Sequence, residues 1–408
     1  MNLKKTPIVF SCDENYVLQT VVAINSMLKN GLKEQECNIF ILTNGQISKE
    51  GLHLFDILNK YYQNCNLEVL TIDDNIFLDV KLEGWTSPTL YRLLLPEILV
   101  QYQRCVYLDD DILVLKDISE LLDIDMKRAY LAGVEDKQVQ RNGEHAKELG
   151  LCNLNGYINA GVMVMNLELM REQKKQEEFL TLVKNGYRFA DQDVLNKSCY
   201  GQIMFLPREY NYFALFPERD SSIRILHFAG RPMDRPWLNE RSKDAAVWWK
   251  YAEQFEQSSI YKKTYQEVKQ ISKGRSFREV LDCCKKYQKI FIWGYTKYGC
   301  ELLNALSRNG VCHIAGFVDS NPEKQKETYQ GYKVYSPESL ENGKEFLVIN
   351  AAQNHRDSIN KVLLQMKYKY ENIFQFYIKV PEYYEILDEK YFDDEFREYL
   401  LKEYGIRR

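Results

Sequence analysis

The chain has 408 residues, a formal net charge of −4 at pH 7 and a hydrophobic content of 45%. This length exceeds the size at which one hydrophobic core usually stops growing, so we expect more than one domain. The mildly acidic balance argues against nucleic acid or an anionic membrane as a partner. No stretch approaches the ~20 apolar residues of a spanning helix, so we expect no integral membrane segment and a cytoplasmic protein. The 10 cysteines lack Cys-x-x-Cys spacing, which favours buried free thiols over disulfides or zinc.

The first part of the chain alternates predicted strands and helices. From the N-terminus the segments read as strand, helix, strand, helix, strand, strand and helix, over residues 7–12, 16–28, 37–43, 88–99, 105–114, 157–167 and 190–199. Alternation of this kind predicts a mostly parallel sheet covered by helices.

Three acids, Asp109, Asp110 and Asp111, interrupt the apolar segment 105–114. Neighbouring carboxylates repel each other, so a positive partner is expected beside them. Side chains two apart in extended backbone point the same way, which lets Asp109 and Asp111 converge on one divalent cation while Asp110 faces elsewhere. A solvated acidic turn is the competing interpretation. The carboxyl end of a strand is also where open α/β sheets bind ligands, so a cation there could carry a phosphate-bearing molecule.

Residues 237–288 read as helical and charged, with Trp248 and Trp249 on one apolar face. Packing of that face on the core is the favoured interpretation, and a sugar-stacking platform is the alternative. A second α/β unit then begins with a strand over 289–294, followed by a glycine turn, a helix over 298–309 and a further strand.

The turn from Gly294 to Gly299 resembles a dinucleotide-binding turn. However, Thr296 occupies the place of the middle glycine, which lets a pyrophosphate approach the backbone. We therefore expect a Rossmann-like domain without a cofactor. A working nicotinamide site, with Asp319 on the ribose, is the alternative.

Six elements of sequence in the first part of the chain occur in an order typical of one enzyme family. They are Phe10-Ser-Cys-Asp-Glu-Asn-Tyr16, Tyr91-Arg92-Leu93, Tyr107-Leu-Asp-Asp-Asp111, Ile158-Asn-Ala-Gly-Val162, Asp191-Gln-Asp193, and His227-Phe-Ala-Gly230 followed by Arg235-Pro-Trp237. Together they resemble the retaining glycosyltransferases of family 8, which include bacterial lipooligosaccharide galactosyltransferases and glycogenin. The resemblance covers residues 7–252 and implies a GT-A-type nucleotide-sugar-binding domain.

The expected fold class is therefore α/β, a GT-A-type domain with a second, smaller Rossmann-like α/β domain. The catalytic domain is expected over residues 1–257 and a helical connector over 258–287. The Rossmann-like add-on domain would follow over 288–380, and a helical tail over 381–408 would complete the chain.

The resemblance implies that Asp109, Asp111 and His227 bind a metal ion. An imidazole ligand favours Mn²⁺, with Mg²⁺ also compatible. The cation would neutralise a diphosphate that departs with about two negative charges. For His227 alone, an ordinary core or surface histidine is the competing interpretation.

The resemblance also implies a donor site. Asp13 would accept a hydrogen bond from uracil, with helix capping as its alternative. Asp191 would hold donor-sugar hydroxyls and Gln192 would lie under the face opposite the leaving group, which makes these two the expected catalytic residues. Arg235 stands where the family has a lysine, so either Arg235 or Arg231 is expected to clamp the diphosphate. The full expected substrate-binding set is Asp13, Asn15, Tyr16, Arg92, Asp109, Asp110, Asn159, Ala160, Gly161, Asp191, Gln192, His227, Gly230 and Arg235.

We therefore expect a metal-dependent retaining enzyme that moves a hexose, galactose before glucose, from a UDP-sugar donor to a glycan acceptor. The acceptor would belong to a cell-surface polysaccharide, a lipooligosaccharide or a glycoprotein. Front-side attack is favoured over a covalent intermediate because Gln192 is a poor nucleophile. A catalytically silent sugar-binding or scaffold protein and a nicotinamide-dependent oxidoreductase are the alternatives. The C-terminal domain and tail are expected to help dock the acceptor.

Overall fold

The computed structural model describes residues 5–32, 35–82, 85–216, 219, 221–230, 234–239, 242–272, 277–340, 346–352, 359, 362–363, 366 and 373–375. The chain divides into two compact units, residues 1–269 and 270–408. Each unit is described by itself. The predicted tail over 381–408 lies outside the described residues.

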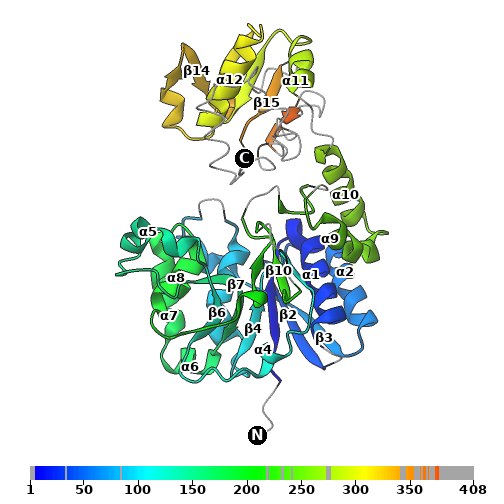
Figure 1. The fold of residues 1–408 in the computed structure, drawn as a ribbon, viewed down its shortest axis with the longest axis vertical. Helices are drawn as coiled ribbons and strands as arrows, with labels where there is room; N and C mark the ends of the chain where they lie inside the picture. Colours follow the sequence, from blue (N-terminus) through cyan, green and yellow to red (C-terminus); the bar gives the residue numbers. More distant parts are fainter. Residues whose placement is uncertain are drawn as a thin grey trace. The chain divides into compact units, whose positions relative to one another are not determined.

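The first unit is built on a seven-stranded mixed sheet with the strand order β3-β2-β1-β4-β7-β6-β8 (Figure 1). These strands are β1 (Ile8–Ser11), β2 (Cys37–Thr43), β3 (Cys65–Thr71), β4 (Cys105–Leu108), β6 (Leu131–Glu135), β7 (Ile158–Met165) and β8 (Ile203–Phe205). The strands β3, β2, β1 and β4 run parallel, but β7 is antiparallel to both β4 and β6. The expected mostly parallel sheet is therefore confirmed, with β7 as its one antiparallel strand.

A smaller sheet consists of β5 (Ile112–Val114), β10 (Ile225–His227) and β9 (Tyr212–Phe213). Its strand β5 follows the three acids directly in the chain. The expected single strand over 105–114 is in fact two strands of different sheets, β4 and β5, joined by a bend at the three acids. In that bend the backbone leaves the extended conformation, so the simple alternation of side chains does not apply to Asp109, Asp110 and Asp111.

Alternating side chains of β1 divide the core of the first unit into two layers. Ile8 and Phe10 pack with residues of α1, α2 and α9, whereas Val9 packs on the opposite face with residues of α3, α6, α7 and α8. The helices of this unit are α1 (Val17–Asn30), α2 (Lys49–Tyr61), α3 (Leu95–Ile98), α4 (Glu120–Asp123), α5 (Gly143–Glu148), α6 (Leu167–Glu172), α7 (Lys175–Leu182), α8 (Ala190–Ser198), α9 (Ala245–Ala252) and, across the division, α10 (Ser259–Ser272).

The tryptophan pair of α9 belongs to the core. Trp248 is fully buried, Trp249 is 9% exposed, and Trp237 packs against Trp248 with ring centroids 5.3 Å apart. The packing interpretation of this pair is therefore confirmed, and the alternative of a sugar-stacking platform is wrong.

The second unit contains a six-stranded sheet with the order β13-β14-β12-β11-β15-β16, in which only β13 runs antiparallel to its neighbour. Its strands are β11 (Ile290–Trp293), β12 (Ile314–Val318), β13 (Thr328–Tyr329), β14 (Tyr332–Tyr335), β15 (Leu347–Asn350) and β16 (Ile373–Gln375). Its helices are α11 (Phe277–Cys284) and α12 (Lys297–Arg308). A side chain at Gly299 would place its Cβ 2.1 Å from the carbonyl oxygen of Gly294, so the glycine turn is tightly closed.

Within the described part of the chain, no helix combines the length and apolar character needed to cross a bilayer. All 10 cysteines are free, and seven of them are buried. The predicted free thiols are confirmed.

The buried indole of Trp248 yields a stability prediction. Trp248→Ala should lower the free energy of unfolding by about 3–5 kcal/mol because it removes a large side chain from the centre of the core. Trp248→Phe should cost clearly less, because the indole nitrogen finds no hydrogen-bond partner among the described residues. Urea unfolding followed by near-UV circular dichroism would compare the two variants. Equal losses for both would contradict this account.

Candidate functional site

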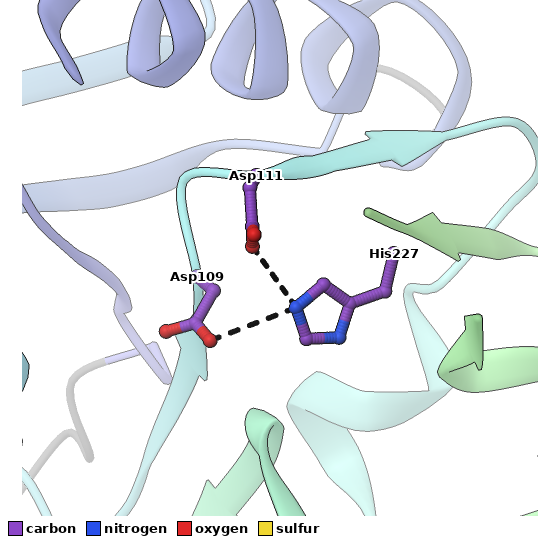
Figure 2. A group of neighbouring side chains, drawn as sticks. All are labelled: Asp109, Asp111 and His227. Atoms are coloured by element: carbon purple, nitrogen blue, oxygen red, sulfur yellow. Dashed lines mark ion pairs between the residues drawn. The ribbon is translucent and has the colours of Figure 1, made fainter. Parts of the chain in front are cut away.

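Two strand pairings bring the acids and His227 together. The strand β4 ends at Leu108, the acids follow in the bend, and β5 begins at Ile112. His227, the last residue of β10, is paired with Ile112 in the antiparallel ladder. The neighbouring amide of Phe228 donates to the carbonyl of Asp111 at 2.8 Å. The backbone therefore fixes His227 beside the acids (Figure 2).

Asp109, Asp111 and His227 form a compact group in which one ligand atom from each residue lies within 4.8 Å of the others. The Nε2 atom of His227 is 2.9 Å from Oδ1 of Asp111 and 3.7 Å from Oδ2 of Asp109, as the dashed lines of Figure 2 show. His227 is 2% and Asp111 is 9% exposed. Two carboxylates and one imidazole at these separations could hold a divalent cation.

A chain of side-chain amides determines which nitrogen of His227 faces the acids. The backbone amide of Gly161 donates to Oδ1 of Asn159, which fixes that atom as an acceptor. Nδ2 of Asn211 donates to the same oxygen at 2.8 Å, so Oδ1 of Asn211 is left to face Nδ1 of His227, also at 2.8 Å. Nδ1 of His227 therefore carries a proton and donates, and Nε2 is directed at the carboxylates.

This orientation requires positive charge between Nε2 and the acids. Burial by itself would lower the pKa of His227, but Asp111 and then Asp109 outweigh it and raise that pKa above its ordinary value. Burial would likewise raise the pKa of Asp111, but the facing His227 holds that pKa below its ordinary value. A proton on Nε2 satisfies the group, and a metal cation would satisfy it in the same place.

Gly161 leaves room for this group. A Cβ atom at position 161 would lie 2.3 Å from Cε1 of His227 and 2.7 Å from Oδ2 of Asp109. Any larger residue would push the imidazole or the carboxylate away. Gly161, which lies within β7, is therefore a steric requirement of the Asp109, Asp111 and His227 group.

Arg92 joins the acids to helix α8. Its Nη2 donates to Oδ1 of Asp109 at 2.7 Å and its Nη1 donates to the carbonyl of Ala160 at 2.6 Å. Its Nε is 3.0 Å from Oδ2 of Asp191, an ion pair in which the N–H is not aligned for a hydrogen bond. Arg92 is only 5% exposed, so its ion pairs with Asp109 and Asp191 are buried and are not surface salt bridges. The acids around it raise the pKa of Arg92 despite its burial.

Asp191 and Gln192 lie on the first turn of α8 and face the same cavity. Burial raises the pKa of Asp191 to about 7, although Arg92 acts in the opposite direction. Oε1 of Gln192 accepts two hydrogen bonds of 3.0 Å, from Nδ2 of Asn159 and from the amide of Ala160. The amide nitrogen of Gln192 faces Oδ2 of Asp136 at 3.5 Å. The orientation of the Gln192 side chain is therefore set by its neighbours.

These groups line one cavity of about 330 Å³, a size typical of small-molecule sites. Every sequence-predicted site residue except Asn15 lines it: Asp13, Tyr16, Arg92, Asp109, Asp110, Asp111, Asn159, Ala160, Gly161, Asp191, Gln192, His227, Gly230 and Arg235. Asp110 lines the same cavity but is not part of the group of possible metal ligands, as expected. Asn15 is exposed, and its backbone amide donates to Oδ1 of Asp13.

Asp13 and Arg235 flank the acids at the edge of the cavity. Asp13 caps the short 3₁₀ helix Glu14–Tyr16 and also lines the cavity. Its carboxylate can therefore cap the helix and still contact a bound ligand. Arg235 lies 3.9 Å from Oδ2 of Asp111 and donates to the hydroxyl of Tyr16 at 3.3 Å. Burial and nearby acids raise the pKa of Tyr16 to about 12. Arg231, the alternative diphosphate clamp, lies outside the described residues.

Sequence reasoning missed several residues of the site. Asn211, which orients His227, follows Tyr210 in a segment without a recognisable pattern, and only the fold reveals its position. Trp85 and Phe189 also line the cavity. Trp85 is 45% exposed and its indole N–H donates to the carbonyl of Arg188 at 3.3 Å.

Two protein-family models match the chain. The model for glycosyl transferase family 8 matches residues 7–241, which is more than half of the sequence. A model described as C2185-like, N-terminal, matches residues 286–374. That second match is to a different domain from the one predicted, so the Rossmann-like identity of the C-terminal unit is not confirmed.

Curated relatives are similar to the first unit. A protein of Haemophilus influenzae named as a glycosyltransferase is 29% identical over 211 residues, which cover 50% of this chain and 62% of the relative. A lipopolysaccharide 1,2-glucosyltransferase of Escherichia coli is 27% identical over 250 residues, covering 55% of this chain and 71% of the relative. A lipopolysaccharide 1,3-galactosyltransferase of Salmonella typhimurium is 24% identical over 251 residues, covering 57% of this chain and 73% of the relative.

Solved structures share the fold. The bifunctional glycosyltransferase WbbM superposes with a TM-score of 0.56 at 23% identity, over 65% of this chain and 52% of that chain. The galactosyltransferase LgtC superposes with a TM-score of 0.52 at 24% identity, over 61% of this chain and 96% of that chain. These likenesses show an α/β GT-A-like fold with a mixed sheet. The family model is what shows the family, because it matches more than half of the sequence: the chain belongs to glycosyl transferase family 8.

Proposed function

We propose that this chain is a metal-dependent transferase that moves a hexose from a UDP-sugar to a glycan acceptor. The observation that carries the proposal is the group of Asp109, Asp111 and His227, with Nε2 of the histidine directed at both acids inside the main cavity. Family membership supports the transfer of sugars, and the buried acids support a donor whose leaving group is negatively charged.

The residues fit a divalent cation. Asp109, Asp111 and His227 would hold it, and the mixture of carboxylate and imidazole ligands favours Mn²⁺ while permitting Mg²⁺. The space that Gly161 leaves open beside two of the ligands is consistent with this role. When bound, the cation supplies Lewis-acid neutralisation of the diphosphate leaving group.

The chain's own residues would bind the nucleotide. The carboxylate of Asp13 would accept a hydrogen bond from uracil, and Asp110 would contact the donor from the same bend as the metal ligands. Arg235 would clamp the diphosphate, because its guanidinium lies beside Asp111 at the cavity edge. Tyr16, which Arg235 contacts, would complete this side of the donor site.

The remaining predicted residues would surround the sugar. Asp191 would accept hydrogen bonds from donor hydroxyls, with Arg92 holding it in place. Gln192 would lie under the sugar face opposite the leaving group, and both lone-pair directions of its oxygen are already used by Asn159 and Ala160. That engagement supports front-side attack with retention over a covalent intermediate on Gln192.

In front-side attack, the acceptor hydroxyl oxygen forms the new bond to the anomeric carbon while the bond to the diphosphate oxygen breaks. The proton of the hydroxyl passes to the departing phosphate oxygen, so charge and atoms balance. No side chain of the protein needs to take that proton. Asp191 and Gln192 therefore act by positioning the sugar and by stabilising charge near the anomeric carbon.

The acceptor we propose is a glycan of a surface polysaccharide, a lipooligosaccharide or a glycoprotein. Two relatives are named for lipopolysaccharide glucosyl and galactosyl transfer, which supports a hexose donor and a surface glycan. Galactose is preferred over glucose. Cytoplasmic location and the docking role of the C-terminal unit stay predictions.

We also propose that the C-terminal unit is Rossmann-like without a nicotinamide site. Its central parallel strands and the glycine turn after β11 support the first part. Against a nicotinamide site, the carboxylate of Asp319 already accepts hydrogen bonds of 3.0 Å from the amides of Tyr295 and Asn321 and pairs with Lys324 at 3.2 Å. A ribose would have to displace these partners. The oxidoreductase alternative is therefore not favoured.

The function is tested by UDP release from a panel of UDP-sugars with and without Mn²⁺. The wild type should release UDP from a UDP-hexose in the presence of Mn²⁺ and stop when a chelator is added. Asp109→Ala should lower the rate by more than about 100-fold, because it removes a proposed metal ligand and one of the two carboxylates that pair with Arg92. Asp123→Ala, at an exposed site on α4, is the matched control and should keep the wild-type rate. A rate of UDP release that is unchanged both by the chelator and by Asp109→Ala would refute the proposal.

The raised pKa of His227 predicts how Mn²⁺ binding depends on pH. A proton on Nε2 and the cation compete for the same position, so affinity should fall as pH drops below the raised pKa. The lowered pKa of Asp111 keeps that ligand ionised over the same range. Titration of Mn²⁺ by electron paramagnetic resonance between about pH 7.5 and pH 5.5 should show up to about a tenfold loss per pH unit. Constant affinity over that range would be inconsistent with His227 as a ligand.

The orienting role of Asn211 predicts a further loss of affinity. Asn211→Leu keeps the size of the side chain but leaves Nδ1 of His227 without its acceptor, so Mn²⁺ affinity should fall by about 10–100-fold. Asn211→Asp keeps an oxygen toward Nδ1 and should bind the ion more tightly than the leucine variant does. The same titration measures both. A leucine variant with wild-type affinity would show that Asn211 does not set the orientation of His227.

A further inference from the structure

Asp193, the third residue of the Asp191-Gln-Asp193 motif, does not line the cavity. It is fully buried, and each of its oxygens is engaged. Oδ1 accepts hydrogen bonds from the hydroxyl of Tyr157 at 2.6 Å and pairs with Nε2 of His145 at 2.7 Å. Oδ2 accepts from the backbone amide of Phe189 at 2.7 Å. Burying a carboxylate without hydrogen-bond donors would cost much free energy. These three donors offset that cost and hold the Asp193 side chain in one orientation.

Aromatic rings enclose this carboxylate. His145 is 1% exposed, and its ring meets the ring of Phe189 edge-on at 5.1 Å and that of Tyr157 at 6.3 Å. Its second nitrogen, Nδ1, lies 2.9 Å from Oε2 of Glu148. Burial and then Asp193 raise the pKa of Tyr157 well above its ordinary value, so its hydroxyl stays protonated and can donate. We call Asp193, His145 and Tyr157 the buried triad.

The buried triad lies next to the most unusual backbone of helix α8. Ala190, the first residue of the helix, has φ of +42°, a left-handed conformation that disfavours residues with a Cβ atom. The residue before it, Phe189, has no side chain that can cap the helix. Asp193, four residues after Phe189, does part of that task from within the helix, because its carboxylate accepts the hydrogen bond of the Phe189 amide.

The strained residue is followed directly by the two predicted catalytic residues. Asp191 faces Arg92, and Gln192 faces Asn159 and Ala160, so both depend on the path of the backbone at Ala190. Tyr157 directly precedes β7, the strand that carries Asn159 and Ala160. The triad thus connects the start of α8 to the start of β7, and none of its three residues lines the cavity.

We propose that the buried triad is a positioning device for the reaction. It holds Ala190 in its left-handed conformation, and this aims Asp191 and Gln192 at the donor sugar. Strain of this kind persists only where surrounding contacts enforce it, and it tends to occur at functional sites. The inference rests on the proposed sugar-transfer function, because it assigns the triad a role in that reaction.

Three substitutions test the positioning role. Asp193→Asn keeps the shape of the side chain but places an amide N–H₂ among three donors. His145→Phe fills the same space without the partner of Asp193. Both should lower kcat for Mn²⁺-dependent UDP release by about tenfold or more, since a shift of about 1 Å can cost that much in rate. Adding Ala190→Gly to His145→Phe should restore most of the lost rate, because glycine adopts positive φ without cost and does not need the triad to hold it there.

Two further readouts separate positioning from simple stabilisation. UDP affinity in the presence of Mn²⁺ should stay within about twofold of the wild type, because the nucleotide contacts lie elsewhere in the cavity. The kcat of the His145→Phe/Ala190→Gly double variant should recover although its buried triad is still incomplete. A purely structural triad would not give a recovery of kcat that depends on the residue at position 190. Asp123→Asn, an exposed site, is the matched control for Asp193→Asn.

The outcomes discriminate between the two hypotheses. Given wild-type turnover, full kcat in His145→Phe or no recovery of kcat in the His145→Phe/Ala190→Gly double variant would overturn the positioning role alone. Parallel loss of kcat, UDP affinity and melting temperature in every variant would also overturn it, since that pattern belongs to a general loss of structure. Absence of UDP release in the wild type would instead count against the proposed function.

Discussion

The mutual approach of His227 and the two acids is the interaction on which this account depends. Nε2 of the histidine faces the carboxylates of Asp109 and Asp111 because Asn211 fixes Nδ1 on the other side of the ring. Such an arrangement is stable only with positive charge between the facing atoms. In a protein of glycosyl transferase family 8, a divalent cation in place of a proton would give the site the charge that a departing diphosphate requires.

The fold holds these groups at strand ends and in a bend rather than on flexible loops. The acids lie where the chain leaves the main sheet for the small sheet, and the β5–β10 ladder places His227 beside them. Gly161 on β7 leaves the space they need, and Arg92 connects Asp109 to Asp191 on α8. Placing charged groups on rigid elements lowers the reorganisation needed when a substrate binds.

Local patterns in the sequence predicted much of this structure. Apolar runs located β1, β2, β7, α1 and α8 to within a few residues, because strands and helices are encoded by neighbouring side chains. Motif order indicated the family, and all but one of the predicted site residues line the cavity, Asn15 being the exception. Several motif residues converge because they lie at strand ends: the acids follow β4, and His227 ends β10.

What sequence reasoning missed depends on pairings between distant segments. The antiparallel direction of β7 and the break between β4 and β5 arise from the whole sheet, and no local pattern encodes them. Asn211 orients His227 through a hydrogen bond between residues 16 positions apart in the sequence. His145 pairs with Asp193, which is 48 positions further along the chain. Neither residue has a distinctive neighbour in the sequence. Contacts of this kind become visible only once the strands are in place.

The central claim concerns the identity of the ligands, and it is tested most directly by pulsed electron paramagnetic resonance of Mn²⁺ bound to the protein. The account predicts one directly bound imidazole nitrogen that disappears in His227→Gln. Tightly bound Mn²⁺ with no nitrogen coupling, or coupling that survives the loss of His227, would contradict the account.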